Sequence, residues 1–338
     1  LLADSLCKGA SAKDNVKRIH EWLTKNIRYS YEPFRQSAYV PQLAHDVLST
    51  KIGDCKDMAS LGQYLFGKAG VKSWLTLVNT QVKADGSRAL IGPDFNHCIL
   101  AWDDENQLKF IDFTSPYMSI NSLPSGNQGA IALVVGKIDT LIKLPYDRVE
   151  NASYYRAIDA SIDSVGFLSS TNKTIRTGRY AAAFRSRYRD VSPDRQKVLM
   201  LKSLTADYSG IVLDTFITGE LNQLTDSVTY VYKYHTPSAV AINGNIATLQ
   251  IKMPDEISPN EFPLEEKRTR PLDLEGTYLT DTRYDMIYKL TFNRKWKPVT
   301  VPKNVTISSP YGKYSLSFTT KANEITCVRA AEFYFKDV

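Results

Sequence analysis

The chain has 338 residues, with 4 cysteines, 4 histidines and a formal net charge of +6. Hydrophobic residues make up 43% and charged residues 23%, a globular composition that excludes a disordered or collagen-like chain. Because the length exceeds one domain of about 150 residues, we expect at least two domains. No apolar run reaches the roughly 18 residues of a membrane-spanning helix. Acidic residues are interleaved with the basic ones, which argues against a nucleic-acid-binding protein.

Residues 1–140 predict an α+β domain. A helix is expected over residues 11–27, where Ser11 is a suitable N-cap and apolar side chains recur every three or four positions. A second helix is expected from Asp54 to Gly70, because glycine favours the left-handed conformation that ends many helices. Segments rich in β-branched and aromatic residues predict short strands at 74–80, 97–102 and 108–113.

Residues 141–338 predict a second, β-rich domain. Apolar and polar residues alternate with a period of two in three segments, at 228–234, 286–292 and 314–318. Regularly spaced strands of this kind favour a mostly antiparallel β-sandwich, here interrupted by helices near 178–189 and 193–207. We place the domain boundary within the segment 137–150.

Six arginines surround the helix expected over residues 178–189. A surface for polyanions is one interpretation, but Ala181, Phe184 and Tyr188 form a helical apolar stripe. This stripe favours the simpler interpretation, in which the arginines line the solvated side of the helix. The six are Arg176, Arg179, Arg185, Arg187, Arg189 and Arg195.

The segment of residues 53–57 places Cys55 in the first turn of the second helix, after a glycine that permits a tight turn. Backbone N–H groups and the helix dipole favour a thiolate there, but the dipole contributes only about 0.3–1 kcal/mol. An activated cysteine at this position therefore needs a cationic partner such as a histidine.

A histidine and an acid fall on the two strands that follow. The polar residues 103–106 connect these strands, and a turn centred between residues 104 and 105 places His97 directly opposite Asp112. Directly opposed side chains have Cβ atoms about 4.5–5.5 Å apart, so the carboxylate can hold one imidazole nitrogen and set its tautomer. A slip of one residue would turn the two side chains to opposite faces. Together with Cys55, the pair predicts a catalytic triad for a thiol nucleophile.

The remaining cysteines lack the spacing of a disulfide framework or a zinc cluster. Cys98 follows His97 onto the other face of its strand, so we expect a small buried side chain. A zinc site formed by the triad residues themselves is disfavoured, because a cysteine at a helix start with a His–Asp pair on strands fits nucleophilic catalysis better. We expect no metal and no cofactor. The other histidines are expected at the surface or at helix caps: His20, His45 and His235.

Three motifs resemble those of a known family: GDCKD at residues 53–57, FNHCI at 95–99 and IDFT at 111–114. The family is the transglutaminase-like superfamily, with its papain-like core, in the bacterial envelope-associated branch where β-rich domains of unknown function flank that core. The resemblance covers residues 12–136. The region beyond, including residues 178–180 and 270–272, resembles the β-rich domain that follows the core. It implies that Cys55 is the nucleophile, His97 the general base and acid, and Asp112 the orienting carboxylate.

The resemblance also implies a reaction. The thiolate attacks an amide carbonyl of a peptide or protein, and a thioester forms that is resolved by water or by an amine. We favour hydrolysis, because amine transfer requires that an amine outcompete water at the thioester. Tyr31 and Tyr39 are candidate donors to the oxyanion, although a packing role is favoured for each. The resemblance further implies export to the bacterial periplasm or cell surface and a β-rich domain ahead of residue 1.

An interpretation from a different class stays open. The triad can persist in a binding or scaffolding module of the cell envelope that has little turnover. In that case the β-rich domain supplies the contacts with a partner. The reactivity of Cys55 distinguishes this module from an enzyme.

Overall fold

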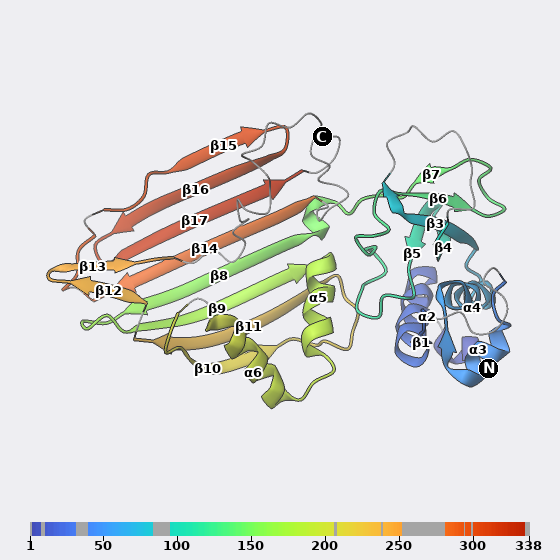
Figure 1. Cartoon of the computed structure of the whole chain (residues 1–338), viewed down its shortest axis with the longest axis horizontal. Coiled ribbons are helices and arrows are strands. Elements are labelled where there is room, and N and C mark those ends of the chain that lie inside the picture. Colours follow the sequence, from blue (N-terminus) through green and yellow to red (C-terminus); the bar gives the residue numbers. More distant parts are fainter. Residues whose placement is uncertain are drawn as a thin grey trace. The chain divides into compact units, whose positions relative to one another are not determined.

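The computed structural model describes residues 2–7, 11–31, 40–83, 95–205, 208–237, 239–251, 281–293, 295–298 and 300–334. The chain divides into two compact units (Figure 1). The N-terminal unit comprises residues 1–147 with the short segments 181–183 and 222–226. The C-terminal unit comprises residues 148–180, 184–221 and 227–338.

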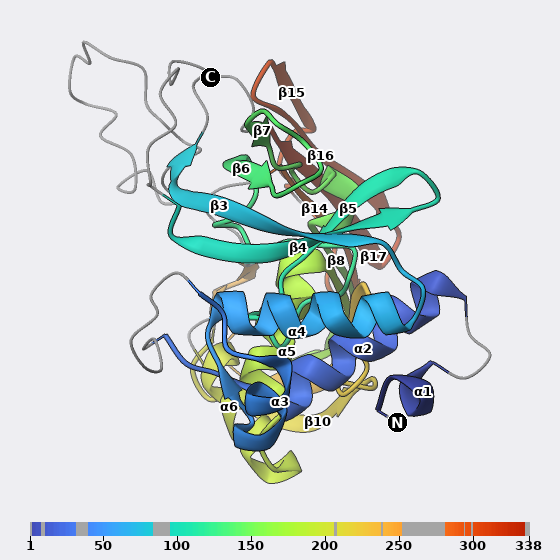
Figure 2. The same ribbon diagram turned by 90° about the vertical axis from the view of Figure 1, so that its right-hand side faces the viewer.

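The N-terminal unit contains an antiparallel sheet of five strands in the order β5-β4-β3-β6-β7. Helices α2 and α4 lie on one side of this sheet (Figure 2). The strands are β3 (Ser73–Lys83), β4 (His97–Asp104), β5 (Gln107–Ile111), β6 (Ala130–Val134) and β7 (Ile142–Lys143), with a separate parallel pair β1 (Arg28–Tyr29) and β2 (Ile52–Gly53). The helices are α1 (Leu2–Leu6), α2 (Ala12–Asn26), α3 (Ala44–Thr50) and α4 (Cys55–Lys68).

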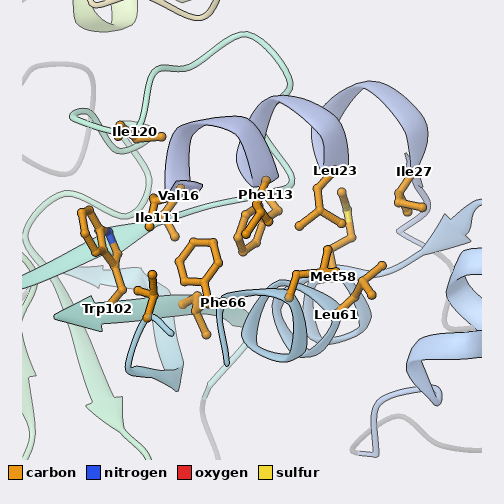
Figure 3. Packing of buried hydrophobic residues seen from close by; sticks show 14 of the residues in the cluster. Val16, Leu23, Ile27, Met58, Leu61, Phe66, Trp102, Ile111, Phe113 and Ile120 are labelled. Carbon is orange, nitrogen blue, oxygen red and sulfur yellow. The ribbon is translucent and has the colours of Figure 1, made fainter. Parts of the chain in front are cut away.

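The predicted first helix is confirmed as α2. The Ser11 hydroxyl caps it by accepting a hydrogen bond from the Asp14 backbone N–H at 3.2 Å. Its apolar stripe is fully buried, with Val16, Ile19 and Leu23 all at 0% exposure. This stripe packs on the buried face of α4 and on the sheet (Figure 3). Burying each such side chain stabilises the fold by about 1.5–3 kcal/mol, so helix and sheet are held by a common core.

Phe113 lies two residues after the last residue of β5 and packs into this core. Its ring packs edge-on against Phe66 of α4, with ring centroids 6.0 Å apart. The ring also covers Gly62, where an added Cβ would lie only 2.3 Å from the Phe113 Cε2 atom. The helix therefore needs a residue without a side chain at this position. The contact fixes the chain next to Asp112.

The C-terminal unit is built on one sheet of eight strands in the order β10-β11-β9-β8-β14-β17-β16-β15. All neighbouring pairs are antiparallel except β14 with β8. The strands are β8 (Ser153–Ile162), β9 (Leu168–Thr177), β10 (Val212–Thr218), β11 (Ser227–Thr236), β14 (Thr282–Phe292), β15 (Val305–Ser309), β16 (Gly312–Lys321) and β17 (Glu324–Phe333). A short hairpin of β12 (Val240–Asn243) and β13 (Ile246–Leu249) and a 3-10 turn at Val149–Asn151 complete this part.

The predicted β-sandwich is not confirmed, because the described strands do not form two packed sheets. A period of two shows that one face of a strand is buried, but not what covers that face. Over β10 and β11 the cover is helical: Phe184 of α5 (Gly178–Tyr188) stacks on Tyr230 with ring centroids 4.2 Å apart. Helix α6 (Pro193–Leu204) contacts β10.

The prediction that the arginines near α5 line its solvated side is wrong for Arg185 and Arg176. Arg176 lies on β9, with its guanidinium over the ring of Phe184. Arg185 is 0% exposed, and its Nη2 atom donates a hydrogen bond to the Ser227 carbonyl at 3.3 Å. The buried face of α5 is thus wider than its apolar stripe, and it includes Arg185 beside that stripe. No helix in the described ranges is long and apolar enough to cross a membrane.

Two glycines of α4 should respond in opposite ways to alanine. We expect Gly62→Ala to lower the free energy of unfolding by about 1–3 kcal/mol, because the new methyl group overlaps the Phe113 ring. Gly67→Ala meets no atom within 4 Å and should raise the free energy of unfolding by about 0.5–1 kcal/mol. Urea unfolding of both variants measures this difference. Equal destabilisation of the two would contradict the close contact between α4 and Phe113.

Candidate active site

Cys55 is the first residue of α4, as the sequence predicts. Asp54 is the N-cap, and it forms a reciprocal capping box with Asp57, in which each side chain accepts a hydrogen bond from the other's backbone N–H. The first N–H groups of a helix have no partner within the helix, so the backbone N–H of Cys55 points outward as a donor. The Cys55 side chain is half-buried and forms no disulfide. A substrate carbonyl at this position would meet both a sulfur atom and a backbone N–H group.

The capping aspartate Asp57 also holds the segment before α3. Its two carboxylate oxygens accept hydrogen bonds from the backbone N–H and the side-chain amide of Gln42, both at 2.7 Å. Gly53 approaches the same side chain closely, since an added Cβ would lie 2.9 Å from the Asp57 Cβ. Asp57 is 2% exposed and acts as the anchor of the turn that presents Cys55.

The structure brings His97 and Asp112 together. The His97 Nε2 atom lies 2.8 Å from the Asp112 Oδ2 atom, and both side chains are largely buried. His97 is the first residue of β4, while Asp112 directly follows the last residue of β5. The carboxylate thus occupies one imidazole nitrogen and leaves Nδ1 as the nitrogen available to a second partner.

The predicted strand register is wrong by two residues. The strands β4 and β5 pair Leu100 with Ile111, because a two-residue turn at Glu105 and Asn106 joins them, with φ angles of 53° and 68°. Such left-handed pairs form the tight hairpin turns that match strand twist. Continuing this register makes His97 a diagonal rather than a direct neighbour of Asp112. Since a shift of two residues keeps every side chain on its face, the pair still forms.

Asp112 accepts hydrogen bonds from three residues. Besides His97, the Thr114 backbone N–H and hydroxyl donate to its Oδ1 atom at 2.8 and 2.7 Å. The side-chain amide of Asn127 donates to Oδ2 at 2.7 Å. Burial opposes ionisation, but these hydrogen bonds and the His97 charge hold the pKa of Asp112 below its ordinary value. Asp112 is therefore a buried carboxylate, at 5% exposure, whose two oxygens both accept hydrogen bonds.

Two of these donors were not predicted. Thr114 lies two residues after Asp112, and an aspartate that accepts from the backbone N–H two positions on is a common turn motif that the IDFT segment contains. Asn127 follows after a connection of more than ten residues, and no local pattern marks it as a partner.

His97 is poised to carry a positive charge. Burial alone would lower the pKa of its imidazole, but hydrogen bonds with Asp112 and Cys55, and the negative charges of both, raise it to about 10. His20 of α2 gives the contrast within the same unit. Burial lowers its pKa to about 4 despite the nearby Asp112 charge, so this imidazole is neutral at pH 7. The expectation that His20 lies at the surface is wrong, since it is 1% exposed.

Among the described tyrosines, Tyr29 lies near the site, and it was not one of the two predicted from the sequence. Strand β1 pairs with β2 and sets Tyr29 opposite Gly53, two residues before Cys55. Burial and the charges of Cys55, Asp112 and Asp54 raise the pKa of Tyr29 to about 12, so its hydroxyl keeps its proton. Tyr31 is 87% exposed, and Tyr39 lies outside the described residues. The pairing of residues 28–29 with 52–53 gives no recognisable sequence signal, because each strand is only two residues long.

The other cysteines are not part of this cluster. Cys98 is buried, as expected for a side chain on the opposite face from His97, and burial raises the pKa of its thiol to about 12. Cys327 is buried on β17, and Cys7 is half-buried; none of the three forms a disulfide. Within the described ranges, no group of three or more His, Cys, Asp or Glu side chains is arranged to hold a metal ion.

Comparison with known families agrees with this architecture. Residues 1–130 match the family model of a transglutaminase-like domain, and this part of the chain is a transglutaminase-like domain. A second family model, described as a domain of unknown function with a solved structure, matches residues 245–334. None of the curated proteins matches the chain.

Solved structures that match the chain include the following two. One is a proposed protease from Parabacteroides distasonis, with a TM-score of 0.54 and 13% sequence identity; the match covers 98% of our chain and 48% of that one. Our chain thus spans about half the length of that protein, and the two share a fold. The other is LapG from Legionella pneumophila in its EGTA-treated form, with a TM-score of 0.30 and 14% identity, covering 42% of our chain and 76% of LapG.

The raised pKa of His97 predicts how stability depends on pH. A group whose pKa is higher in the folded state stabilises the fold fully below its unfolded pKa of about 6.5, and this contribution is lost as the pH rises through about 10. The free energy of unfolding should therefore fall between about pH 7 and pH 10 more steeply in the wild type than in His97→Gln. Urea unfolding across this range tests the difference. Parallel curves would show that His97 gains no proton affinity on folding.

Proposed function

We propose that the N-terminal unit is a thiol-dependent enzyme that cleaves amide bonds of peptides or proteins, with Cys55, His97 and Asp112 as its triad. The observation that carries the proposal is the hydrogen bond between the His97 Nε2 atom and the buried Asp112 carboxylate. That bond leaves the Nδ1 side of the ring for Cys55, whose hydrogen bond also contributes to the raised pKa of His97. The shared fold with a proposed protease is consistent with this class of activity.

The proposed reaction proceeds through a thioester. The Cys55 thiol transfers its proton to His97, and the resulting thiolate attacks the carbonyl carbon of the scissile amide. His97 then returns the proton to the departing amine nitrogen as the C–N bond breaks and the acyl group stays on sulfur. A water molecule, deprotonated by His97, attacks the thioester and releases the carboxylic acid and the free thiol. Asp112 stabilises the imidazolium at each stage and fixes its tautomer.

The developing oxyanion needs two donors. The backbone N–H of Cys55 is one, because the first N–H groups of a helix such as α4 have no partner within the helix. We assign the second to the Tyr29 hydroxyl, which keeps its proton at neutral pH and lies within electrostatic range of the Cys55 sulfur. This replaces Tyr31, whose side chain is almost wholly exposed. A charge-stabilising donor of this kind typically contributes about 10²–10³ in kcat.

Hydrolysis is the outcome that the exposure of the site favours over amine transfer. Cys55 is half-buried and Tyr29 is 37% exposed, so water reaches the region where the thioester forms. Transfer to an amine requires that water be excluded from the acyl-enzyme. Export to the bacterial envelope, which rests on the sequence resemblance, stays a prediction.

The reactivity of Cys55 separates an enzyme from a scaffold. At about pH 6, iodoacetamide should modify Cys55 at least about tenfold faster than Cys7, because the positively charged His97 imidazole lies beside Cys55. Cys7 is a matched control within the same chain: it is also half-buried, and burial raises the pKa of its thiol. Peptide mass spectrometry after timed quenching gives both rates. In His97→Ala the advantage of Cys55 should disappear.

Equal rates at the two cysteines in the wild type would remove the case for an activated nucleophile. They would instead favour a binding or scaffolding module that keeps the triad without turnover. Retention of full biological activity by Cys55→Ala would lead to the same conclusion.

Replacing Tyr29 tests the assignment of the second donor. For a peptide that the wild type cleaves, Tyr29→Phe should lower kcat by about 10²–10³-fold, since the donor acts on the transition state. Alkylation of Cys55 should stay at the wild-type rate, because the His97–Asp112 pair is untouched. Tyr64→Phe, on the exposed surface of α4, serves as the control. A loss of kcat in Tyr31→Phe, with full activity in Tyr29→Phe, would move the assignment to Tyr31.

A further inference from the structure

Two arginines on the covered face of the C-terminal sheet have no acidic partner among the described residues. Arg156 lies on β8 and Arg176 on the adjacent strand β9, and both side chains are half-buried. Neither forms an ion pair with a carboxylate of the described residues. A cation removed from water is costly unless an opposite charge or a full set of hydrogen bonds compensates it.

The two guanidinium groups converge on one tyrosine oxygen. Arg156 Nη2 donates to the Tyr154 hydroxyl at 2.7 Å, and Arg176 Nη2 approaches the same oxygen at 3.4 Å. Arg176 Nε donates to the Tyr230 hydroxyl at 3.0 Å. Aromatic rings enclose the Arg176 guanidinium, which lies 4.7 Å from the Tyr154 centroid and 5.4 Å from those of Phe184 and Tyr230. The arrangement holds two positive charges side by side in a rigid aromatic setting.

Two polar atoms in or beside these guanidinium groups have no hydrogen-bond partner among the described residues. The Arg156 Nε and Thr174 Oγ1 atoms are buried and have no hydrogen-bond partner among the described residues. The two residues are directly paired in the β8–β9 ladder, and Thr174 is 0% exposed. Buried donors without a partner are rare in folded proteins, and a bound ion or water molecule is one explanation for them. Here they lie beside two cations that have no ion pair among the described residues, which favours an anion with several acceptor oxygens as the partner.

The neighbouring tyrosine reports the same local field. Burial raises the pKa of Tyr154, but the charges of Arg156 and Arg176 outweigh it and lower that pKa to about 8. Of the two phenols bonded to Arg176, that of Tyr154 has the lowered pKa, whereas burial and the Tyr154 charge raise the pKa of Tyr230.

We propose that Arg156 and Arg176 form a binding site in the C-terminal unit for the carboxylate or phosphate group of a small ligand. Guanidinium groups bind such planar or tetrahedral oxyanions through paired N–H donors. The Thr174 hydroxyl and the Arg156 Nε–H complete the donor set, and the surrounding rings pack against the rest of the ligand. The site is separate from the triad and does not depend on the proposed enzymatic activity.

Anion titration of the intact chain tests the site. We would add inorganic phosphate and, separately, acetate at constant ionic strength and follow the thermal unfolding midpoint. At least one of them should raise the midpoint in a saturable manner, because a ligand that binds only the folded state stabilises it. The more effective anion tells a phosphate from a carboxylate ligand. In Arg156→Gln the apparent Kd should increase by about tenfold or more, whereas Arg195→Gln, which removes an exposed arginine, should bind as the wild type does.

A second measurement on the wild type covers the case that Arg156→Gln does not fold. Anion binding neutralises the two arginines and should raise the pKa of Tyr154, so tyrosinate absorbance near pH 8 should fall as the anion is added. The proposal is overturned if neither anion produces a saturable change in midpoint or absorbance. It is also overturned if Arg156→Gln and Arg195→Gln respond as the wild type does, since the anion then binds only adventitiously.

Discussion

The candidate active site depends on the hydrogen bonds that the buried carboxylate of Asp112 accepts. An ionised carboxylate at 5% exposure is stable only when hydrogen bonds replace its water, and three residues supply four of them. His97 comes from β4, Thr114 from the chain just past β5, and Asn127 from the connection before β6. The same carboxylate thus joins distant segments into one fold and holds the imidazole in the orientation that a thiol partner needs.

The two histidines near this carboxylate show why geometry decides their chemistry. His20 and His97 both feel the charge of Asp112, yet burial lowers the pKa of His20 and direct hydrogen bonds raise that of His97. Only the ring with the direct bond can act as a cation at neutral pH. His20 instead packs against Phe113, the residue after Asp112, with ring centroids 5.7 Å apart. Proximity to a carboxylate is therefore not enough to raise the pKa of a buried histidine. A direct hydrogen bond to the carboxylate is needed as well.

Local patterns predicted the helices α2, α4, α5 and α6 and the strands β3, β4, β5, β11, β14 and β16, because caps and periodicity act over a few residues. The other described helices and strands, among them α1 and α3, were not predicted. The His97–Asp112 pair was reached from a register that was off by two residues, and it survived because side chains alternate with that period. Two contacts that depend on long-range packing were not predicted: Asn127 as a partner of Asp112, and Tyr29 near Cys55. The predicted β-sandwich is not confirmed by the described strands, eight of which form one sheet. No pattern within a segment encodes which distant segment covers it.

Trapping of an acyl-enzyme intermediate tests whether Cys55 is the nucleophile. The chain would be mixed with a peptide ester library, quenched in acid within the first turnover and analysed by intact-mass and peptide mass spectrometry. If Cys55 is the nucleophile, an adduct that hydroxylamine removes should form on Cys55, and its accumulation should be lost in both His97→Gln and Cys55→Ala. An adduct on Cys7, or product formation that persists in Cys55→Ala, would contradict the assignment of Cys55 as the nucleophile.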